Sequence, residues 1–407
     1  MTPDELLDRV DDSFCLDFLS QMVRHKSYSE SEGELELARW MDVRMRELGL
    51  DSELQDVPGG RANAIGRLKG AGGGGKSLLF NGHLDTNPAT EGWTVDPWGG
   101  VVDGEFIYGI GVSNMKAGDA AYFCAVKTLV DAGVKLKGDV VLTYVVGELQ
   151  GGIGTVAAIE QGVKADCFIN SEPTDLQALT MHAGSLIWTI ELTGKTRHLS
   201  KRGEAVDALA AASELVPLIN NATFSGVQSE AHRKVNLGHV GVVQAALGCE
   251  LYEWRPPQVA DFARLRGSCR YAPGQTEESV LADMREMLDA LEARHPGLKA
   301  QLIPEKQVGR PTMAPFEVDP EAPIVKAVNA AYEKVRGEPQ PTGVFAPPAY
   351  FGTDAAHFYQ RLGMEGIVCG PGGKYNTMPD ERVEIREYLD MVRIYLLAIL
   401  SVCEVAV

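Results

Sequence analysis

The spacing of apolar residues predicts alternating helices and buried strands over the first part of the chain. Apolar residues recur every three or four positions over 14–23 and 32–48, which predicts two amphipathic helices. Apolar runs that end at glycine or polar residues predict strands, with helical spacing between them. These strands lie at 51–57, 62–68, 77–85, 140–146 and from Cys167, and the helices at 117–132 and from Ile153. The alternation indicates an α/β domain with an open sheet.

The pattern changes near Met181. Strand-like segments at 185–192, 235–243, 262–271 and 298–303 alternate with helical segments at 204–219 and 277–291. This β-α-β-β-α-β order is typical of a small open-faced sandwich. Helices over 322–335 and 384–402 and a strand at 366–369 then resume the first pattern. The sequence therefore predicts one α/β domain formed by 1–182 and 305–407, interrupted by a smaller α+β domain at 183–304.

Composition narrows the class of protein. With 407 residues, 45% hydrophobic and 23% charged, the chain can bury a large core in two domains. Its net charge of -18 argues against nucleic acid or an anionic membrane as a partner. The N-terminus is acidic and no apolar run approaches the ~20 residues of a membrane span, so a cytoplasmic location is expected. Seven scattered cysteines without a C-x-x-C pair indicate neither a disulfide framework nor a thiolate zinc site.

Candidate chemistry gathers at the ends of three predicted strands. His83 and Asp85 end the first, Glu148 follows the second and Glu172 the third. A carboxylate beside an imidazole can fix its tautomer and leave the other nitrogen for a metal or a substrate proton. A lone His-x-Asp is also an ordinary polar strand end, but three such ends favour a functional site. Asn114 follows a glycine-rich turn before a helix, where it is either part of this site or a helix N-cap.

Eight motifs in order resemble the di-zinc peptidase and deacylase family of aminoacylase, acetylornithine deacetylase, succinyl-diaminopimelate desuccinylase and glutamate carboxypeptidase. The motifs are GHLD at 82–85, YGIGVSNMK at 108–116, ELQGG at 148–152, EPT at 172–174, GKTRH at 194–198, RYAPG at 270–274, GTDA at 352–355 and GPGGKYNTMPDE at 370–381. The resemblance implies a zinc-peptidase-like catalytic domain with an inserted lid domain that forms a homodimer. This agrees with the domain pattern predicted from periodicity.

The resemblance also implies roles for individual residues. His83 and Glu172 match ligands of one zinc ion, Asp85 the carboxylate that orients His83, and Glu148 the general base. In the inserted domain, His198 matches a histidine that stabilises the tetrahedral intermediate, often from the partner subunit. The positions that match substrate-binding residues are Arg270, Asn236, Gly352 and Thr353. A guanidinium at Arg270 suits a substrate carboxylate because its fork matches that group.

Three positions depart from the family pattern. Asn114 replaces the aspartate that bridges both zinc ions, Leu149 a glutamate ligand and Thr377 a histidine ligand. Leu149 and Thr377 both belong to the ion that His83 and Glu172 do not serve. The changes at Asn114 and Leu149 remove two negative charges, which matches the loss of one divalent ion. The expected site holds one zinc, manganese or cobalt ion on His83, Glu172 and Asn114, or no metal.

Three functions are compatible with these residues. With one ion, the protein is an amide hydrolase of a small carboxylate-bearing substrate, an N-acyl amino acid or a dipeptide, with Glu148 as the base. Without a metal, Glu148 and the His83–Asp85 pair form an acid/base site for cyclisation or acyl transfer. In the third function, the protein binds a ligand without catalysis.

Overall fold

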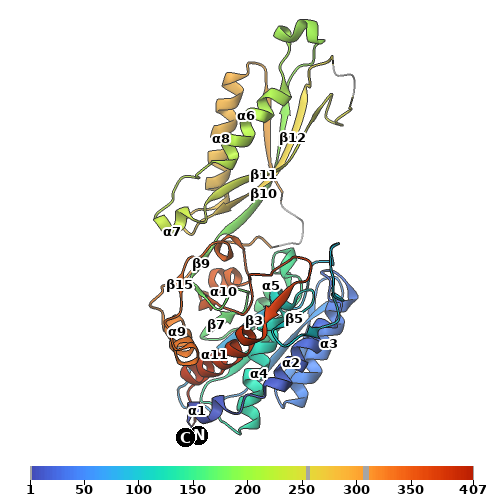
Figure 1. Cartoon of the computed structure of the whole chain (residues 1–407). Helices are drawn as coiled ribbons and strands as arrows, with labels where there is room; N and C mark the ends of the chain where they lie inside the picture. The colour runs from blue at the N-terminus through green and yellow to red at the C-terminus, as the bar shows by residue number, and fades with distance from the viewer. Residues whose placement is uncertain (1, 254–256, 306–310, 407) are drawn as a thin grey trace. The chain divides into compact units, whose positions relative to one another are not determined.

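The structure is a computed structural model of the chain, and it describes residues 2–253, 257–305 and 311–406. The chain forms two compact units (Figure 1). The first comprises Met1–Met181, Phe316–Pro348 and Thr353–Val407, and the second His182–Pro315 and Ala349–Gly352. Within the described residues, no helix combines the length and apolarity that a membrane span needs.

The first unit is built on an eight-stranded mixed sheet. Its strands, in spatial order, are β1 (Asp51–Val57), β2 (Arg61–Leu68), β6 (Val140–Val145), β3 (Leu78–His83), β7 (Cys167–Asn170), β16 (Glu365–Val368), β8 (Ala178–Leu179) and β15 (Thr342–Gly343). The four central strands β6, β3, β7 and β16 are parallel neighbours. Every residue of β3, β6 and β7 is buried, which explains their continuous apolar sequences. The predicted α/β fold class is confirmed.

Helices cover both faces of this sheet. Alternate residues of β3 point to opposite faces, so Phe80 packs against Tyr122 and Tyr395 with ring centroids 5.3 and 5.0 Å away, whereas Asn81 donates a 3.2 Å hydrogen bond to Thr155. The helices on the Phe80 face are α2 (Asp12–Val23), α3 (Glu32–Glu47), α4 (Ala117–Asp131), α9 (Pro323–Arg336) and α11 (Ile385–Cys403). The other face carries α5 (Ile153–Glu160) and α10 (Ala355–Leu362).

Short elements fill segments that the sequence pattern left as loops. A three-stranded sheet joins β4 (Val101–Val102) and β5 (Phe106–Tyr108) to β17 (Arg382–Glu384), far apart in the sequence. Strands of two or three residues are too short to show a period, so apolar spacing could not predict them. Further short elements include α1 (Pro3–Leu7), α7 (Glu230–Arg233), β9 (Met181–His182) and β14 (Phe316–Glu317).

The second unit is an antiparallel sheet with two helices on one face. Its strand order is β11 (Leu237–Ala246), β12 (Phe262–Tyr271), β10 (Gly184–Thr193) and β13 (Lys299–Pro304), with α6 (Ala208–Asn220) and α8 (Glu277–Arg294) packed on it. Trp188, Leu215, Leu265 and Leu288 are fully buried in its core. Along the chain these elements follow the predicted β-α-β-β-α-β order. A lid or dimerisation role for this unit stays a prediction.

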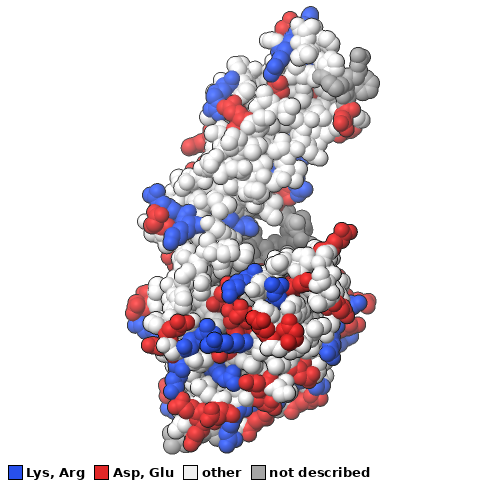
Figure 2. Space-filling view, in the orientation of Figure 1, with Lys and Arg blue, Asp and Glu red and all other residues white. Residues whose placement is uncertain are grey.

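The surface of the first unit carries charges of both signs. On the face drawn in Figure 2, acidic and basic side chains are interspersed over its described residues. Some form exposed ion pairs, such as Lys334 with Asp4 at 2.7 Å. Exposed pairs of this kind contribute little to stability because water and salt screen them.

Candidate metal centre and active site

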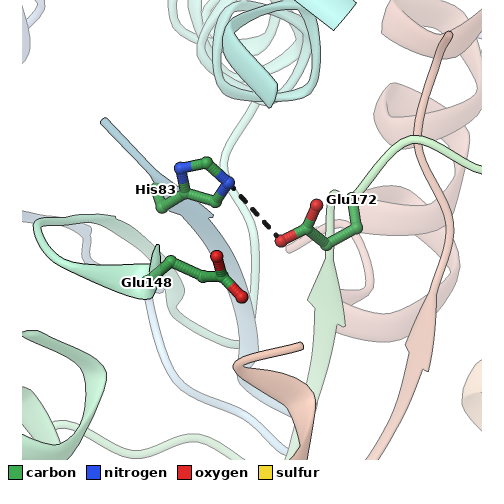
Figure 3. Close-up of side chains that lie close together, drawn as sticks. All are labelled: His83, Glu148 and Glu172. Carbon is green, nitrogen blue, oxygen red and sulfur yellow. Dashed lines mark ion pairs between the residues drawn. The ribbon is translucent and has the colours of Figure 1, made fainter. Parts of the chain in front are cut away.

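The carboxyl ends of three adjacent parallel strands bring the candidate catalytic side chains together. His83 is the last residue of β3, Glu148 lies three residues beyond β6 and Glu172 two beyond β7. Because β6, β3 and β7 are parallel neighbours, their carboxyl ends meet at the same edge of the sheet. Ligand atoms of the three side chains all lie within 4.8 Å of one another. Figure 3 shows both carboxylates directed toward the imidazole.

The cluster fits one divalent metal ion. The Nε2 atom of His83 lies 3.6 Å from Glu172 Oε1 and 3.2 Å from Asn114 Oδ1. Nitrogen and carboxylate oxygen are ordinary ligand atoms for zinc and similar ions, and three protein ligands plus water form a catalytic site. His83 and Glu172 are buried, whereas His83 and Asn114 also line a cavity from which water or substrate could reach a bound ion.

The electrostatics of the cluster call for positive charge. Burial raises the pKa of Glu148 and Glu172, and the negative charge of Glu172 raises the pKa of Glu148 further. For His83, burial lowers the pKa, but the fields of Glu172, Asp85 and Glu148 outweigh it and bring the pKa to about 10. The imidazolium thus supplies the positive charge that a metal ion would bring, and metal binding requires this proton to leave.

His83 is oriented mainly by a backbone carbonyl. Its Nδ1 atom lies 2.8 Å from the carbonyl oxygen of Asp85 and 3.5 Å from that residue's carboxylate. In a neutral imidazole, Nδ1–H donates to the carbonyl and leaves the Nε2 lone pair facing the cluster. The Asp85 carboxylate accepts hydrogen bonds from the backbone N–H of Glu148 at 3.1 Å and of Leu149 at 3.2 Å. Asp85 therefore also holds the turn that carries Glu148.

A buried chain of polar side chains supports Asp85. Ser29 Oγ donates to the Asp85 carboxylate at 2.9 Å and accepts from the side-chain amide of Gln150. Arg61 donates to the amide oxygen of Gln150 at 2.6 Å and pairs with Glu34 at 2.5 Å. No sequence motif indicates this series of hydrogen bonds, because its partners lie far apart in the sequence.

Asn114 sits on a turn that a second carboxylate organises. The side chain of Glu381 accepts from the backbone N–H groups of Gly111 at 3.2 Å, Ser113 at 3.0 Å and Asn114 at 3.0 Å. Helix α4 begins at Ala117 and has no side-chain cap. The interpretation of Asn114 as an N-cap is therefore wrong, and its side chain faces His83 instead. Glu381 belongs to a quoted motif, but sequence analysis gave it no role.

Beside the cluster lies a cavity of about 270 Å³ within the first unit, and the three departures from the family pattern line it. These are Asn114, Leu149 and Thr377, and Leu149 is 37% exposed. Neither Leu149 nor Thr377 offers a carboxylate or an imidazole. The donors needed for a second metal ion are therefore missing at these positions.

Three of the predicted residues belong to the second unit. His198 is exposed, with Nδ1 2.9 Å from Ser200 Oγ. Asn236 is buried, and its amide bonds the backbone of Phe224 and the side chain of Gln275 at 3.0–3.1 Å. Arg270 donates through Nε to the Tyr350 carbonyl at 2.9 Å and through Nη1 to the Ser185 hydroxyl. Burial lowers the pKa of Arg270 from its usual value.

The last two predicted substrate-binding residues belong to different units. Gly352 lies in the second unit, where a Cβ would come within 2.9 Å of Met313 Cβ. Thr353 lies in the first unit, is buried and accepts a 3.2 Å hydrogen bond from the backbone N–H of Ala355 at the start of α10. The roles of all five residues in substrate binding and catalysis stay predictions.

An α/β sheet that presents an imidazole, the buried carboxylate of Glu172 and the half-buried carboxylate of Glu148 at its carboxyl edge suits metal-dependent hydrolysis. Residues 79–401 match the sequence profile described as "Peptidase family M20/M25/M40". The chain belongs to this family, as its motifs predicted, and is a hydrolytic enzyme of the amidohydrolase and peptidase type.

Known relatives agree with this assignment. The chain is 27% identical over 387 residues to N-formyl-4-amino-5-aminomethyl-2-methylpyrimidine deformylase of Bacillus subtilis, covering 89% of this chain and 88% of the relative. It is also 27% identical over 363 residues to an acetylornithine deacetylase of Salmonella paratyphi B, covering 86% and 85% of the two chains. A Bacillus subtilis structure described as a dinuclear metal-binding M20 peptidase shares the fold, with a TM-score of 0.65, 19% identity and coverage of 96% and 99%.

A buried histidine near the Glu148 turn predicts a pH-dependent stability. His357 is 4% exposed, its Nε2 lies 2.8 Å from the Gly151 carbonyl, and burial lowers its pKa from 6.5 to about 4. The unfolded chain therefore binds a proton that the folded protein does not. The associated stability is fully present above pH 6.5 and is lost, by up to ~3 kcal/mol, as the pH falls toward 4.

Denaturant unfolding measured across this pH range tests the effect in the wild type and in His357→Gln. Glutamine keeps an N–H near the position of Nε2 but does not titrate. The difference in unfolding free energy between the two proteins should shrink toward acid pH. A difference that stays constant from pH 7 to pH 4 would contradict the assignment.

Proposed function

We propose that this protein is an amide hydrolase that works with a single zinc, manganese or cobalt ion on a small carboxylate-bearing substrate, an N-acyl amino acid or a dipeptide. The observation that carries the proposal is the contrast between two neighbouring sets of side chains. His83, Glu148 and Glu172 converge within 4.8 Å, whereas Leu149 and Thr377 offer no strong ligand next to them.

In this proposal each residue of the cluster has a distinct task. His83 and Glu172 hold the ion, with the amide oxygen of Asn114 as a weaker third ligand. The bound ion supplies a Lewis acid that polarises the scissile carbonyl and lowers the pKa of water. Glu148 takes a proton from the attacking water and passes it to the leaving amine. The hydrogen bond from its backbone N–H to Asp85 keeps Glu148 in place.

The second unit would supply the groups that recognise substrate. The contacts of Arg270 with Tyr350 and Ser185 fix its guanidinium, and among the described residues its Nη2 atom has no hydrogen-bond partner, which supports a role in binding a carboxylate. His198 is exposed and remains the proposed oxyanion-stabilising group. The role of Asn236 in holding a substrate carbonyl has less support, because its amide is engaged in the interior of the unit.

Self-association through the second unit is a further part of the proposal. Strand β11 is an edge of its sheet, and Val242 and Val243 on it are 47% and 42% exposed. An edge strand presents unpaired backbone groups that can pair with another chain. Pairing with a second copy would also remove these two valines from water.

One observation favours a second candidate function. His83 Nε2 lies 3.6 Å from Glu172 Oε1, which is an ion-pair distance when the imidazole is protonated, so the same side chains can also form a metal-free acid/base site. Such a site could carry out cyclisation or acyl transfer with Glu148 and the His83–Asp85 pair. Metal content separates this candidate from the hydrolase.

Elemental analysis of protein purified without chelators should find one divalent ion per chain. His83→Ala and Glu172→Gln should each lose it, because each removes a strong ligand. His239→Ala, at an exposed position on β11, is the matched control and should keep the ion. A chain that stays metal-free after zinc, manganese and cobalt are added back would favour the second candidate, and two ions per chain would contradict a single-metal site.

Glu148→Gln should lower turnover by at least ~100-fold, because glutamine cannot accept the proton. The variant should keep its ion, since Glu148 is proposed as the base and not as a ligand. Hydrolysis and metal content are measured on the same sample, with the exposed Glu36→Gln as control. Loss of the ion together with turnover would instead make Glu148 a ligand.

Restoring three ligands should restore a second ion. In the variant that combines Asn114→Asp, Leu149→Glu and Thr377→His, we expect two ions per chain, because the added carboxylates and imidazole complete the family's ligand set. The matched control keeps Asn114 and carries the neutral substitutions Leu149→Gln and Thr377→Asn. It should bind one ion per chain. If the first variant also binds one ion, these three positions do not explain the reduced site.

A further inference from the structure

The cavity beside the metal cluster is lined mainly by uncharged side chains. Trp93, Ile110, Leu149 and Met378 contribute apolar surface, and Leu149 and Met378 are 37% and 43% exposed. Exposed apolar side chains that line a concave site next to catalytic groups are typical of a ligand pocket. A volume of about 270 Å³ suits one substituent of a small molecule.

The two carboxylates in the wall of this cavity already have donors. Asp85 accepts hydrogen bonds from two backbone N–H groups and from Ser29, and Glu381 accepts from three backbone N–H groups. A cation in the cavity would have to compete with these bonds for the same oxygens. His83 and Asn114, the proposed metal ligands, also line the cavity, but its two carboxylates offer a cationic substituent no group that is free of other donors.

One donor in the cavity wall is available to an incoming group. The amide nitrogen of Asn114 has no hydrogen-bond partner among the described residues, since its oxygen alone contacts His83. An uncharged acceptor atom of a ligand can accept a hydrogen bond from this amide.

We propose that this cavity is a substrate subsite for an uncharged, predominantly apolar acyl group, with Leu149 and Met378 in its wall. The inference rests on the proposed function, in which the cluster cleaves an amide bond. The cavity adjoins the cluster through His83 and Asn114, so it can receive the acyl side of that bond. Leu149 has then replaced a metal ligand by a contact that selects the acyl group.

Binding to the metal-loaded Glu148→Gln protein tests this subsite without turnover. The probes are N-benzoylglycine, with an apolar acyl group, N-succinylglycine, with a charged one, and N-acetylglycine as the small reference. Isothermal titration calorimetry should show that N-benzoylglycine binds about tenfold more tightly than N-succinylglycine. Equal affinity for these two probes would overturn the proposal.

A substitution in the cavity wall tests whether this cavity causes the preference for the benzoyl group. Leu149→Glu in the same background should remove at least about tenfold of the preference for the benzoyl group, because it places a carboxylate in the apolar wall. Leu54→Glu is the matched control: Leu54 is also 37% exposed but lies on β1, outside the cavity lining. If the two glutamate variants retain the same preference, the cavity does not bind the acyl group.

Tryptophan fluorescence gives an independent readout. N-benzoylglycine should change the emission of the protein, and Trp93→Phe should remove most of that change while the metal content stays at one. An unchanged response in Trp93→Phe would contradict binding in this cavity.

The two levels of the proposal fail in different ways. A protein with one ion and Glu148-dependent turnover, but with no effect of Leu149→Glu on probe preference, keeps the hydrolase function and rejects the subsite. A metal-free protein without turnover, in which Leu149→Glu still abolishes the benzoyl preference, supports the subsite and rejects the hydrolase.

Discussion

The site depends on the burial of several carboxylates at one edge of a parallel sheet. Glu148 and Glu172 come from strands on either side of His83, and a low-dielectric surrounding strengthens their repulsion. The fold is stable with both groups in place only if positive charge or protons compensate them. His83 meets this need as an imidazolium, and a divalent ion would meet it after displacing the proton. Metal affinity and the protonation of His83 are therefore coupled.

Carboxylates around the site divide into two kinds according to what they bind. Asp85 and Glu381 accept hydrogen bonds from backbone N–H groups and act on the chain, fixing the turns that carry Glu148 and Asn114. Glu148 and Glu172 have oxygens turned toward His83 and act on whatever binds there (Figure 3). Asp85 and Glu381 therefore hold the turns, and the carboxylates of Glu148 and Glu172 stay available to a bound ion or substrate. This division also explains how Arg61, which pairs with Glu34, contributes to the site through Gln150 and Ser29.

The sequence predicted the parts of this architecture that repeat a local signal. Long helices and buried strands show their period, and the three strand ends could be predicted to converge because parallel neighbours share an edge. The residues that hold these strand ends and turns in place show no comparable pattern in the sequence. Ser29 and Asp85 are 56 residues apart, and Asp380, next to Glu381, bonds Thr94 across 286 positions. Asp119 lies so close to Gly82 that a Cβ there would come within 1.9 Å of its Oδ1, a contact that only coordinates reveal.

The replacements at positions 114 and 149 make sense together in terms of charge. Asp85, Glu148 and Glu172 already surround His83, so an aspartate at position 114 would add a fourth carboxylate and a glutamate at position 149 a fifth. Each extra negative charge would raise the pKa values of the neighbouring carboxylates and would need further positive charge to compensate it. Asn114 keeps an oxygen 3.2 Å from His83 without the charge, and Leu149 offers a hydrocarbon surface in place of a ligand. The loss of two negative charges at these positions is the basis on which we propose a single-metal site.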